Sequence, residues 1–505
     1  MTVKVMYRLL ALIMTVFMFA SMNTAYAVDD AYPSTYTYNY DYWGDIRESP
    51  DAYRVADVIY SGELGLDTVM RKPQSLYVRG NDIYVVDTGN NRILQINREG
   101  DDFTLTRVID QIQGCEVTTF NTPNDVFVDV DGNIYVADTY NNRVVMVDKD
   151  LNFIKQFTKP DDATFDQSLS FLPNKLVVDV SGRVFVLATN VNKGLVKFEA
   201  DTSFTGFIGA NKVTYNLAEY VWKNYFMTKE QRAQQASFVP TEYHNIYIDE
   251  ESFIYATNTI FDEYDLLWDA AQPVRRLNGI GNDILIKNDR YPPIGDIYWV
   301  EGSVTLGPSK LYDITVMEND IYVALDHTRG RLFGYDSQGV MLWAFGTTGN
   351  SEGAFTSAVS VEHMGRDLIV LDELGSTITV FTPTEYGNLI YDASAAYLQG
   401  DYDGSAELWE KVLELNANYN LAFIGIGRSL MRQEDYEAAM DYFKMAKDRD
   451  NYGRAFRFYR KVWVEENIAW LVILIAVVLL VPVIRSSIRK MRMEVEVHER
   501  NQVQK

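Results

Sequence analysis

Two sets of polar residues recur at the same spacing in the amino-terminal half of the chain and are the first candidates for a chemical site. The first set, in the stretch YVVDTGNNRILQI, consists of Asp87, Asn90, Asn91 and Arg92. The second set, in the stretch YVADTYNNRVVMV, consists of Asp138, Asn141, Asn142 and Arg143. A carboxylate, two amides and a guanidinium arranged in this way are suited to catalysis, to metal binding or to shaping a turn.

The length, charge and cysteine content of the chain narrow the classes of function. Its 505 residues, 47% of them hydrophobic, are enough for more than one packed domain. A formal charge of -24 argues against nucleic acid as a partner, because there is no excess of Lys and Arg to displace counterions. A single cysteine, Cys115, excludes an intramolecular disulfide and the metal signatures that need paired cysteines.

The two polar sets belong to longer units of about fifty residues, each with the pattern strand, turn, strand, polar turn, strand. The three clearest units begin at Lys72, Thr122 and Leu172. Fainter copies occupy Glu242–Asn258, Lys310–Asp336 and Ser357–Phe381. This period is typical of propeller blades, which cannot bury both faces alone and therefore stack around an axis. The sequence predicts a mainly β domain, a six-bladed β-propeller, over residues 50–386.

The pattern resembles the NHL repeat family, whose signature Asp-Gly-Asn-Ile-Tyr-Val-Ala-Asp-Thr-x-Asn-Asn-Arg-Val is almost complete in Asp131–Val144. The match is strong in the first two units, partial in the third and reduced to strand pattern in the last three. The resemblance places both polar sets at a strand–turn–strand corner, where Asn tolerates left-handed backbone and Arg pairs with carboxylates or carbonyls. Because a catalytic group is expected once per site and not once per blade, we interpret both sets as a structural blade motif.

Equivalent positions in the six units predict which side chains surround the axis. The residue just before each inner strand should border the central channel, and by alignment these residues are Gln74, Asn124, Asn174, His244, Tyr312 and Ser357. Amides, an imidazole and a phenol suit hydrogen bonding to a sugar or a peptide, so these six are the ligand-binding candidates. The alternative is that they satisfy neighbouring backbone groups or hold channel water.

Signatures of catalysis are scarce. Six-bladed relatives include lactonases with a metal held by carboxylates and Asn, and lyases that use several His. This chain has four His, of which His327 and His363 lie outside the axial positions and His498 lies in the tail. There is no Gly-x-Ser-x-Gly elbow, HExxH motif or phosphate loop. The sequence predicts no catalytic residues, no metal and no cofactor; a metal-dependent, lactonase-like hydrolase or lyase is the alternative.

Both ends of the chain carry membrane signals. Residues 1–27 have a basic start, an apolar run and a small-x-small end, which predicts a signal peptide; an uncleaved anchor is the alternative. Residues 28–49 form a Tyr-rich segment. Residues 468–484 are apolar and uncharged, which predicts a transmembrane helix. Flanking basic residues are nearly balanced, so the export signal sets the topology: a single-pass cell-membrane protein with residues 28–467 outside and a cytoplasmic tail at 485–505.

Residues 387–450 switch to helical spacing and repeat with a shift of thirty-four residues, the tetratricopeptide period. The packing positions of these two repeats are Tyr402, Ser405, Trp409, Gly427, Tyr436, Ala439, Phe443 and Ala446. Such repeats resemble peptide- and protein-binding modules, and a rigid spacer is the alternative. A juxtamembrane helix is predicted at 451–467. A helical insertion at 212–240, within the propeller, is expected to cover one face, meet a partner or pack on a blade edge.

The whole arrangement resembles bacterial exported NHL-propeller proteins with a tetratricopeptide segment and a carboxy-terminal anchor. Two binding-type folds in series, without a catalytic constellation, predict a membrane-anchored extracytoplasmic receptor or scaffold. The propeller is expected to bind a glycan or a protein, and the helical repeats to engage a membrane partner, for example as an accessory of an uptake system. A purely structural assembly factor is a further alternative.

Overall fold

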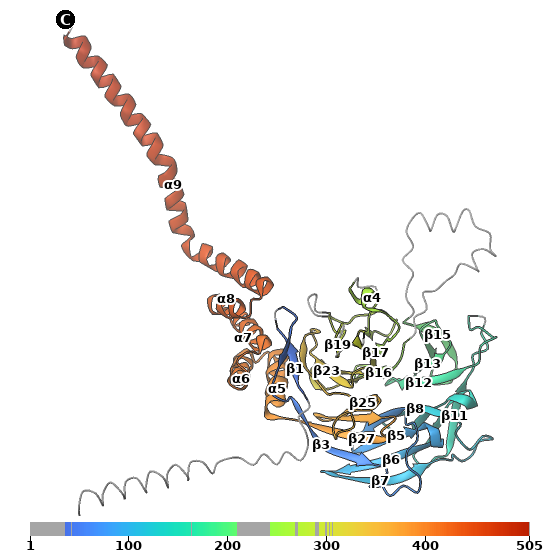
Figure 1. Ribbon diagram of the computed structural model, residues 1–505. Coiled ribbons are helices and arrows are strands. Elements are labelled where there is room, and N and C mark those ends of the chain that lie inside the picture. Colours follow the sequence, from blue (N-terminus) through green and yellow to red (C-terminus); the bar gives the residue numbers. More distant parts are fainter. Residues whose placement is uncertain are drawn as a thin grey trace, which may run out of the picture. The chain divides into compact units, whose positions relative to one another are not determined.

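The structure is a computed structural model of the chain (Figure 1). It describes residues 36–41, 43–162, 164–209, 243–267, 271–287, 292–297, 300–301, 304–305 and 307–503. The predicted signal peptide and the predicted insertion at 212–240 lie outside the described residues, as does the start of the Tyr-rich segment. The chain divides into two compact units. The first contains residues 53–340 and 344–383, and the second contains residues 38–52, 341–343 and 384–503.

The first unit is the predicted six-bladed β-propeller, built of antiparallel sheets in which consecutive strands are neighbours. Its first three blades have four strands each. The first blade contains β4 (Ser75–Arg79), β5 (Asp82–Asp87), β6 (Arg92–Glu99) and β7 (Asp102–Ile109). The second contains β8 (Pro123–Val128), β9 (Ile134–Asp138), β10 (Arg143–Val147) and β11 (Phe153–Thr158). The third contains β12 (Leu172–Val178), β13 (Val184–Thr189), β14 (Leu195–Phe198) and β15 (Phe204–Ile208).

The last three blades are less regular. The fourth has three strands within the described residues: β16 (Ile246–Ile248), β17 (Ile254–Thr257) and β18 (Val274–Leu277). Near it in sequence are helix α4 (Glu263–Leu267) and a small pair, β19 (Val300–Glu301) and β20 (Val304–Thr305). The fifth contains β21 (Leu311–Val316), β22 (Tyr322–Asp326) and β23 (Arg331–Tyr335). The next strand, β24 (Met341–Phe345), is divided between the two units.

The sixth blade closes the propeller. It contains β25 (Ala358–Met364), β26 (Asp367–Asp372) and β27 (Thr377–Pro383), and its fourth strand is β3 (Tyr53–Tyr60) from the start of the unit. β3 pairs antiparallel with β27, with Ile59 opposite Ile378 and Val58 opposite Thr379. Because the two ends of the domain share one sheet, neither end leaves its strand unpaired at the junction.

Burial explains the hydrophobic runs that marked the strands in the sequence. The second strand of a blade is covered on both faces, so β9, with the sequence IYVAD, is buried at every position. The outer strand β7 alternates between exposed and half-buried residues, as expected for a strand with one solvated face. The apolar clusters lie between neighbouring blades. One of them joins Phe127 of β8, Phe157 of β11 and Phe198 of β14.

The second unit is mainly helical. Within its described residues, it contains the hairpin β1 (Tyr38–Tyr40) and β2 (Ile46–Glu48) and five helices. The helices are α5 (Glu385–Gln399), α6 (Tyr402–Leu415), α7 (Asn420–Arg432), α8 (Tyr436–Met445) and α9 (Arg449–Val503). Side chains of Thr384, Asp401 and Asp435 accept hydrogen bonds from backbone N–H groups in the first turns of α5, α6 and α8, which sets where these helices begin.

The predicted packing positions lie where successive helices meet. Ser405 of α6 donates a hydrogen bond to the Ala393 carbonyl of α5 (2.9 Å), and both residues are buried. A side chain at Gly427 of α7 would collide with the Phe443 ring of α8, so the glycine permits this close approach. Trp409, Ala439 and Ala446 are also buried, whereas Tyr402 and Tyr436 are half-buried. The tetratricopeptide identity of these pairs stays a prediction.

Helix α9 is a single helix where the sequence predicted three segments. Residues 451–467, 468–484 and 485–503 all lie within Arg449–Val503, and Pro482 is inside the helix. Within the described residues it is the one helix long and apolar enough to cross a membrane, by length and composition. Its apolar side chains from Ile468 to Ile484 are not covered by the rest of the protein.

Candidate functional site

The repeated polar motif forms a closed hydrogen-bonded corner in the second blade. The buried carboxylate of Asp138 accepts hydrogen bonds from the Asn121 backbone (2.8 Å), the Asn141 side chain (2.8 Å) and the Arg143 guanidinium (2.9 Å). Arg143 also donates to the Val117 carbonyl (2.9 Å). The corner therefore ties the turn after β9 to the loop that precedes β8.

The first blade repeats this geometry. Asp87 accepts hydrogen bonds from the Arg71 backbone (2.7 Å) and from the side chains of Asn90 (2.8 Å) and Arg92 (2.7 Å). Asn91 has a φ of 55°, in the left-handed region, as does its counterpart Asn142. The carboxylates are engaged by protein groups in both corners, which is the arrangement of a structural corner.

The same carboxylate occurs in two blades for which the sequence predicts only the strand pattern. Asp326 and Asp372 end the second strands of the fifth and sixth blades and accept hydrogen bonds from the backbones of Lys310 (2.9 Å) and Thr356 (2.6 Å). The signal was present in the sequence, because each Asp follows an apolar strand as Asp138 does. Ala188 replaces it in the third blade.

The candidate rim residues lie at the start of the inner strands. In the second, third and fifth blades a β-bulge contains Asn124, Asn174 and Tyr312. The equivalent bulge in the sixth blade contains Val359, and Ser357 lies two residues earlier in the chain. The sequence alignment thus places Ser357 two residues before the position that Asn124, Asn174 and Tyr312 occupy in their blades.

Several rim side chains contact one another across blades. Asn124 donates to Asn174 (3.1 Å). His244 Nδ1 lies 3.0 Å from the Tyr312 carbonyl, and its ring centroid is 3.9 Å from that of Tyr312, which in turn stacks on His327. Burial lowers the pKa of His244 to about 4, so its imidazole is neutral at neutral pH. Gln74 accepts a hydrogen bond from Lys175 through its backbone carbonyl (3.3 Å).

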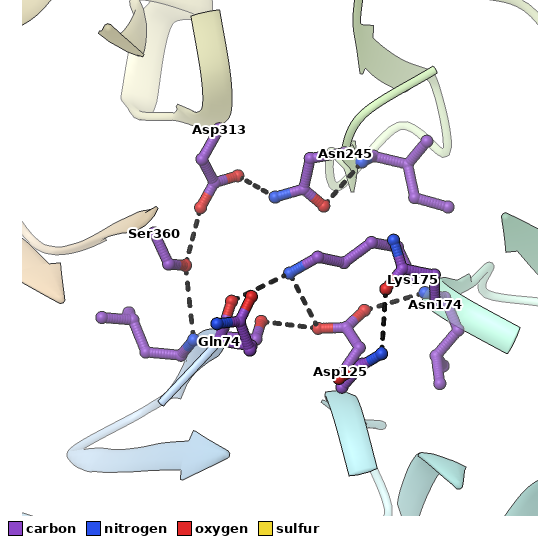
Figure 2. Close-up of polar contacts among 12 residues, drawn as sticks. Gln74, Asp125, Asn174, Lys175, Asn245, Asp313 and Ser360 are labelled. Carbon is purple, nitrogen blue, oxygen red and sulfur yellow. Dashed lines mark hydrogen bonds and ion pairs between the residues drawn. The ribbon is translucent and has the colours of Figure 1, made fainter. Parts of the chain in front are cut away.

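One step further along each inner strand, a second set of side chains forms a ring, here called the axial ring (Figure 2). Its members, one from each blade, are Ser75, Asp125, Lys175, Asn245, Asp313 and Ser360, and all but Ser75 are labelled in Figure 2. Ser75 donates to Asp125 (2.6 Å), and Lys175 lies 3.9 Å from the same carboxylate. Asn245 and Ser360 both donate to Asp313.

The axial ring also serves the backbone. An innermost strand has no neighbour on its axial side, and its free N–H groups need acceptors when buried. Asp125 accepts from the Leu176 backbone (2.8 Å), and Asp313 accepts from the Val361 backbone (2.8 Å). In both cases the N–H belongs to the next blade. The ring is therefore a junction between blades whose polar groups largely satisfy one another.

Next to this ring lies a cavity of about 1170 Å³, here called the axial cavity. Its lining residues come from all six inner strands and from the hairpin turns that follow them, within 75–80, 125–135, 176–182, 245–252, 313–320 and 360–365. Among the described residues, eleven lining residues are Asp or Glu, and one, Arg79, is a Lys or Arg. The cavity is therefore strongly acidic, and the six predicted rim residues are not part of its lining.

A hydrogen-bonded chain lies beside the axial cavity. Thr315 Oγ1 is 2.7 Å from His363 Nδ1 and 3.0 Å from Glu362 Oε2. A hydroxyl has one proton to donate, so a neutral His363 donating to Thr315 lets Thr315 donate to Glu362. Burial lowers the pKa of His363 to about 4, which is consistent with that neutral form. Thr315 is completely buried, so its hydroxyl is out of reach of a substrate.

Burial also governs the carboxyl groups near the axis. It raises the pKa of Glu362 well above its usual value, and the neighbouring charge of Asp313 adds to this effect. Burial likewise raises the pKa values of Asp125 and Asp313, which the charge of Lys175 partly offsets. In the part of the chain that the structure describes, no three His, Cys, Asp or Glu side chains converge on a point that could hold a metal ion.

Comparison with known proteins identifies the repeat. The chain contains an NHL repeat at residues 120–145, the range that matches the NHL family model. A search among curated proteins found no significant match.

The solved structures that match the chain share little sequence with it. Virginiamycin B lyase from Staphylococcus aureus is 11% identical, with a TM-score of 0.40, over 66% of this chain and 100% of that one. Hydrazine synthase from Kuenenia stuttgartiensis is 10% identical, with a TM-score of 0.38, over 63% and 97%. A putative gluconolactonase is 8% identical, with a TM-score of 0.39, over 66% and 94%. The propeller assignment therefore rests on the six sheets of this chain.

Proposed function

We propose that the chain is a membrane-anchored binding protein whose propeller takes a protein or glycan ligand at the axial cavity. The observation that carries this proposal is the cavity itself, to which all six blades contribute lining residues. Concave sites of this kind are where ligands most often bind, and a site built by six blades holds its shape because every blade is packed against two others.

The local chemistry favours binding over catalysis. The carboxylates of the repeated corners are engaged by backbone, Asn and Arg groups, and the hydroxyl between His363 and Glu362 is buried. A nucleophile must be reachable and lie beside a base that can take its proton. Thr315 lies beside His363 and Glu362, but its hydroxyl is buried and a substrate cannot reach it.

The helical unit supplies the second half of the proposal. Helix α9 crosses the cell membrane, the propeller lies outside the cell, and the packed helices α5 to α8 engage a membrane partner as tetratricopeptide repeats do. An accessory role beside an uptake system is the version we favour. The apolar, uncovered stretch of α9 and the regular packing of α5 to α8 support this arrangement.

Site-specific crosslinking in intact cells tests the proposal. A photoreactive residue replaces Val180, which is 83% exposed and lines the cavity, or Ile154, which is 44% exposed on the outer strand β11. We expect a discrete crosslinked partner or glycan from position 180 and none from position 154, identified by mass spectrometry. Equal crosslinking from both positions contradicts a ligand at the cavity.

Activity assays test the enzymatic alternative. Purified full-length protein is incubated with lactones and peptides, and its metal content is measured. If the protein turns over a substrate, and substitution of Glu362 or His363 abolishes that turnover, the protein is an enzyme and the binding proposal is wrong.

A further inference from the structure

We propose that the occupant of the axial cavity is a basic segment of a partner protein, one Lys or Arg side chain of which reaches Glu362. This inference rests on the proposed function and specifies its ligand. Its basis is the combination of an acidic cavity, a buried carboxylate without a cationic partner, and exposed apolar side chains at the hairpin turns of the lining.

The lining of the cavity is predominantly acidic. Three basic residues outside the lining already pair with acidic residues of the lining. Lys175 lies 3.9 Å from Asp125, which is a member of the axial ring. Arg183 pairs with Asp179 (2.5 Å). Arg276 lies near three carboxylates, those of Asp249 (2.9 Å), Asp320 (3.2 Å) and Glu251 (3.6 Å). Among the described residues, the eleven acidic groups of the lining therefore outnumber Arg79 and the three paired cations.

The cavity lining includes a buried carboxylate, that of Glu362, which is 7% exposed. Within the described residues, the basic group paired with Glu362 is His363 alone, at 4.0 Å, and that imidazole is neutral at neutral pH because burial lowers its pKa to about 4. A buried carboxylate is stabilised in its charged form when a cation comes within a few ångströms. A guanidinium or ammonium that enters the cavity supplies this partner.

Aromatic rings beside Glu362 suit the same ligand. Tyr77 and Tyr247 line the cavity, and their hydroxyl groups donate to the carbonyls of Val128 (3.2 Å) and Val316 (3.3 Å) of the next blades. The hydroxyl groups are thereby anchored, and the rings form part of the wall. Aromatic faces attract organic cations, and this attraction is strongest where water is excluded.

Apolar side chains are exposed at the hairpin turns of the cavity lining. Val130 and Val180 lie in these turns and are 79% and 83% exposed. Acidic residues of neighbouring turns include the exposed Asp131, Glu250 and Glu318. Apolar tips among acidic groups match a polypeptide that carries both apolar and basic side chains. The volume also exceeds the range of about 300–1,000 Å³ for small-molecule pockets, which favours a polypeptide over a free amine.

Fluorescence anisotropy tests this inference with full-length protein in detergent micelles. The probe is a labelled heptapeptide of alternating Lys and Val between Gly ends, and the matched probe has Gln at each Lys position. We expect the Lys peptide to bind at least about tenfold more tightly, and its affinity to fall as salt is added, because the attraction is electrostatic.

Variants locate the binding. Glu362→Gln keeps the size of the side chain and an acceptor for Thr315 but removes the charge. We expect it to weaken binding of the Lys peptide about tenfold, since it removes a buried charge partner. The matched control is Asp102→Asn, which removes an exposed carboxylate at the start of β7, outside the cavity lining. We expect this control to bind as the unchanged protein does.

The affinity should also depend on pH. A cation binds the ionised form of Glu362, whose pKa burial raises, so affinity rises as pH rises through that pKa, and binding releases a proton. Isothermal titration in buffers of different ionisation enthalpy measures the proton release. The titratable groups that face Glu362 from neighbouring elements are Tyr77, Asp125, Lys175, Tyr247, Asp313 and His363.

The possible outcomes separate the inference from the function it rests on. Equal binding of the Lys and Gln peptides, or unchanged binding by Glu362→Gln, overturns the basic ligand. If spermidine binds as tightly as the Lys peptide, the proposal of a polypeptide ligand is wrong and the occupant is a free amine. If crosslinking from position 180 succeeds while the Lys peptide does not bind, the binding function stands and its ligand is not basic. If both fail, the proposed function fails.

Discussion

At the scale of single residues, the repeated Asp-x-x-Asn-Asn-Arg motif joins segments that are far apart in the chain. Asp138 connects the turn after its own strand to a loop seventeen residues earlier. Thr139, the next residue, donates to the Pro173 carbonyl of the following blade (2.7 Å), and Thr88 does the same to Pro123 (2.7 Å). The motif thus links each blade to itself and to its neighbour, which explains why it recurs.

Removing the corner carboxylate should destabilise the propeller. We expect Asp138→Ala to lower the free energy of unfolding by about 3–5 kcal/mol, because it leaves the buried Arg143 guanidinium without its partner. Pulse proteolysis in urea measures the change. The matched control is Asp150→Ala, an exposed residue of the same blade, with an expected change within about 0.5 kcal/mol. Similar decreases in the free energy of unfolding for both variants would show that the corner carboxylate stabilises the propeller no more than an exposed one does.

Replacing Glu362 should change how stability depends on pH. The pKa of Glu362 is raised in the folded protein, so the stability it confers is complete below its unfolded pKa near 4.5 and is lost as pH rises through the folded pKa. Gln cannot ionise. We therefore expect Glu362→Gln to match the unchanged protein near pH 4.5 and to exceed it at pH 8 in urea midpoint. A difference that is the same at both pH values contradicts the raised pKa.

At the scale of elements, two local features determine how neighbouring elements pack. The inner strands of four blades contain a β-bulge, and helices α7 and α8 approach closely at a glycine. The bulges of β8, β12, β21 and β25 mark the transition from rim to axial ring. A bulge places an extra residue in one strand, so it changes which side chain faces each neighbour. Residues adjacent in sequence, such as Asn124 and Asp125, therefore occupy different sites.

Gly427 and Gly453 make a matched pair for testing the helix packing. A Cβ at Gly427 would lie 2.7 Å from a Phe443 ring carbon, whereas a Cβ at Gly453 in α9 meets nothing within 4 Å. We expect Gly427→Ala to destabilise the helical unit by about 1–3 kcal/mol through overpacking. We expect Gly453→Ala to stabilise it by about 0.5–1 kcal/mol through helix propensity. Thermal unfolding followed by circular dichroism measures both, and shifts of the same sign contradict the close approach of α7 and α8.

At the scale of the whole molecule, the chain combines a closed propeller with a helical unit that carries a candidate membrane anchor. Charges within the apolar stretch of α9 should weaken membrane association. We expect Leu474→Arg together with Val478→Arg to shift the protein from the membrane to the soluble fraction, because each Arg costs about 2.5–3.5 kcal/mol at the centre of a membrane span. Phe456→Arg, outside that stretch, is the control. Carbonate extraction measures the distribution, and membrane retention of the double variant contradicts the anchor.

The single cysteine offers a direct test of topology. Cys115 is half-buried in the propeller. We expect a membrane-impermeant maleimide to label it in intact cells. In a Cys115→Ser background, Met493→Cys places the thiol in the tail, and we expect labelling only after permeabilisation. The reverse pattern would place the propeller in the cytoplasm.

The sequence by itself determined the propeller and its approximate limits. Strand period, turn residues and a repeat near fifty residues are local features, and each is imposed by a blade that must bury both faces against like blades. It also determined the apolar stretch of α9 and predicted packing positions in α6 to α8. It could not determine that β3 completes the sixth blade, because that pairing joins residues from opposite ends of the domain.

Only the tertiary structure decided which residues face the axis. Sequence alignment selected the rim from Gln74 to Ser357, whereas the side chains that line the axial cavity begin one step later and continue to the hairpin turns. Glu362 and His363 gave no local signal, because their partner Thr315 is forty-seven residues from Glu362 and on another blade. Burial, and the pKa shifts that follow from it, depend on where separate blades converge, and no short stretch of sequence carries that information.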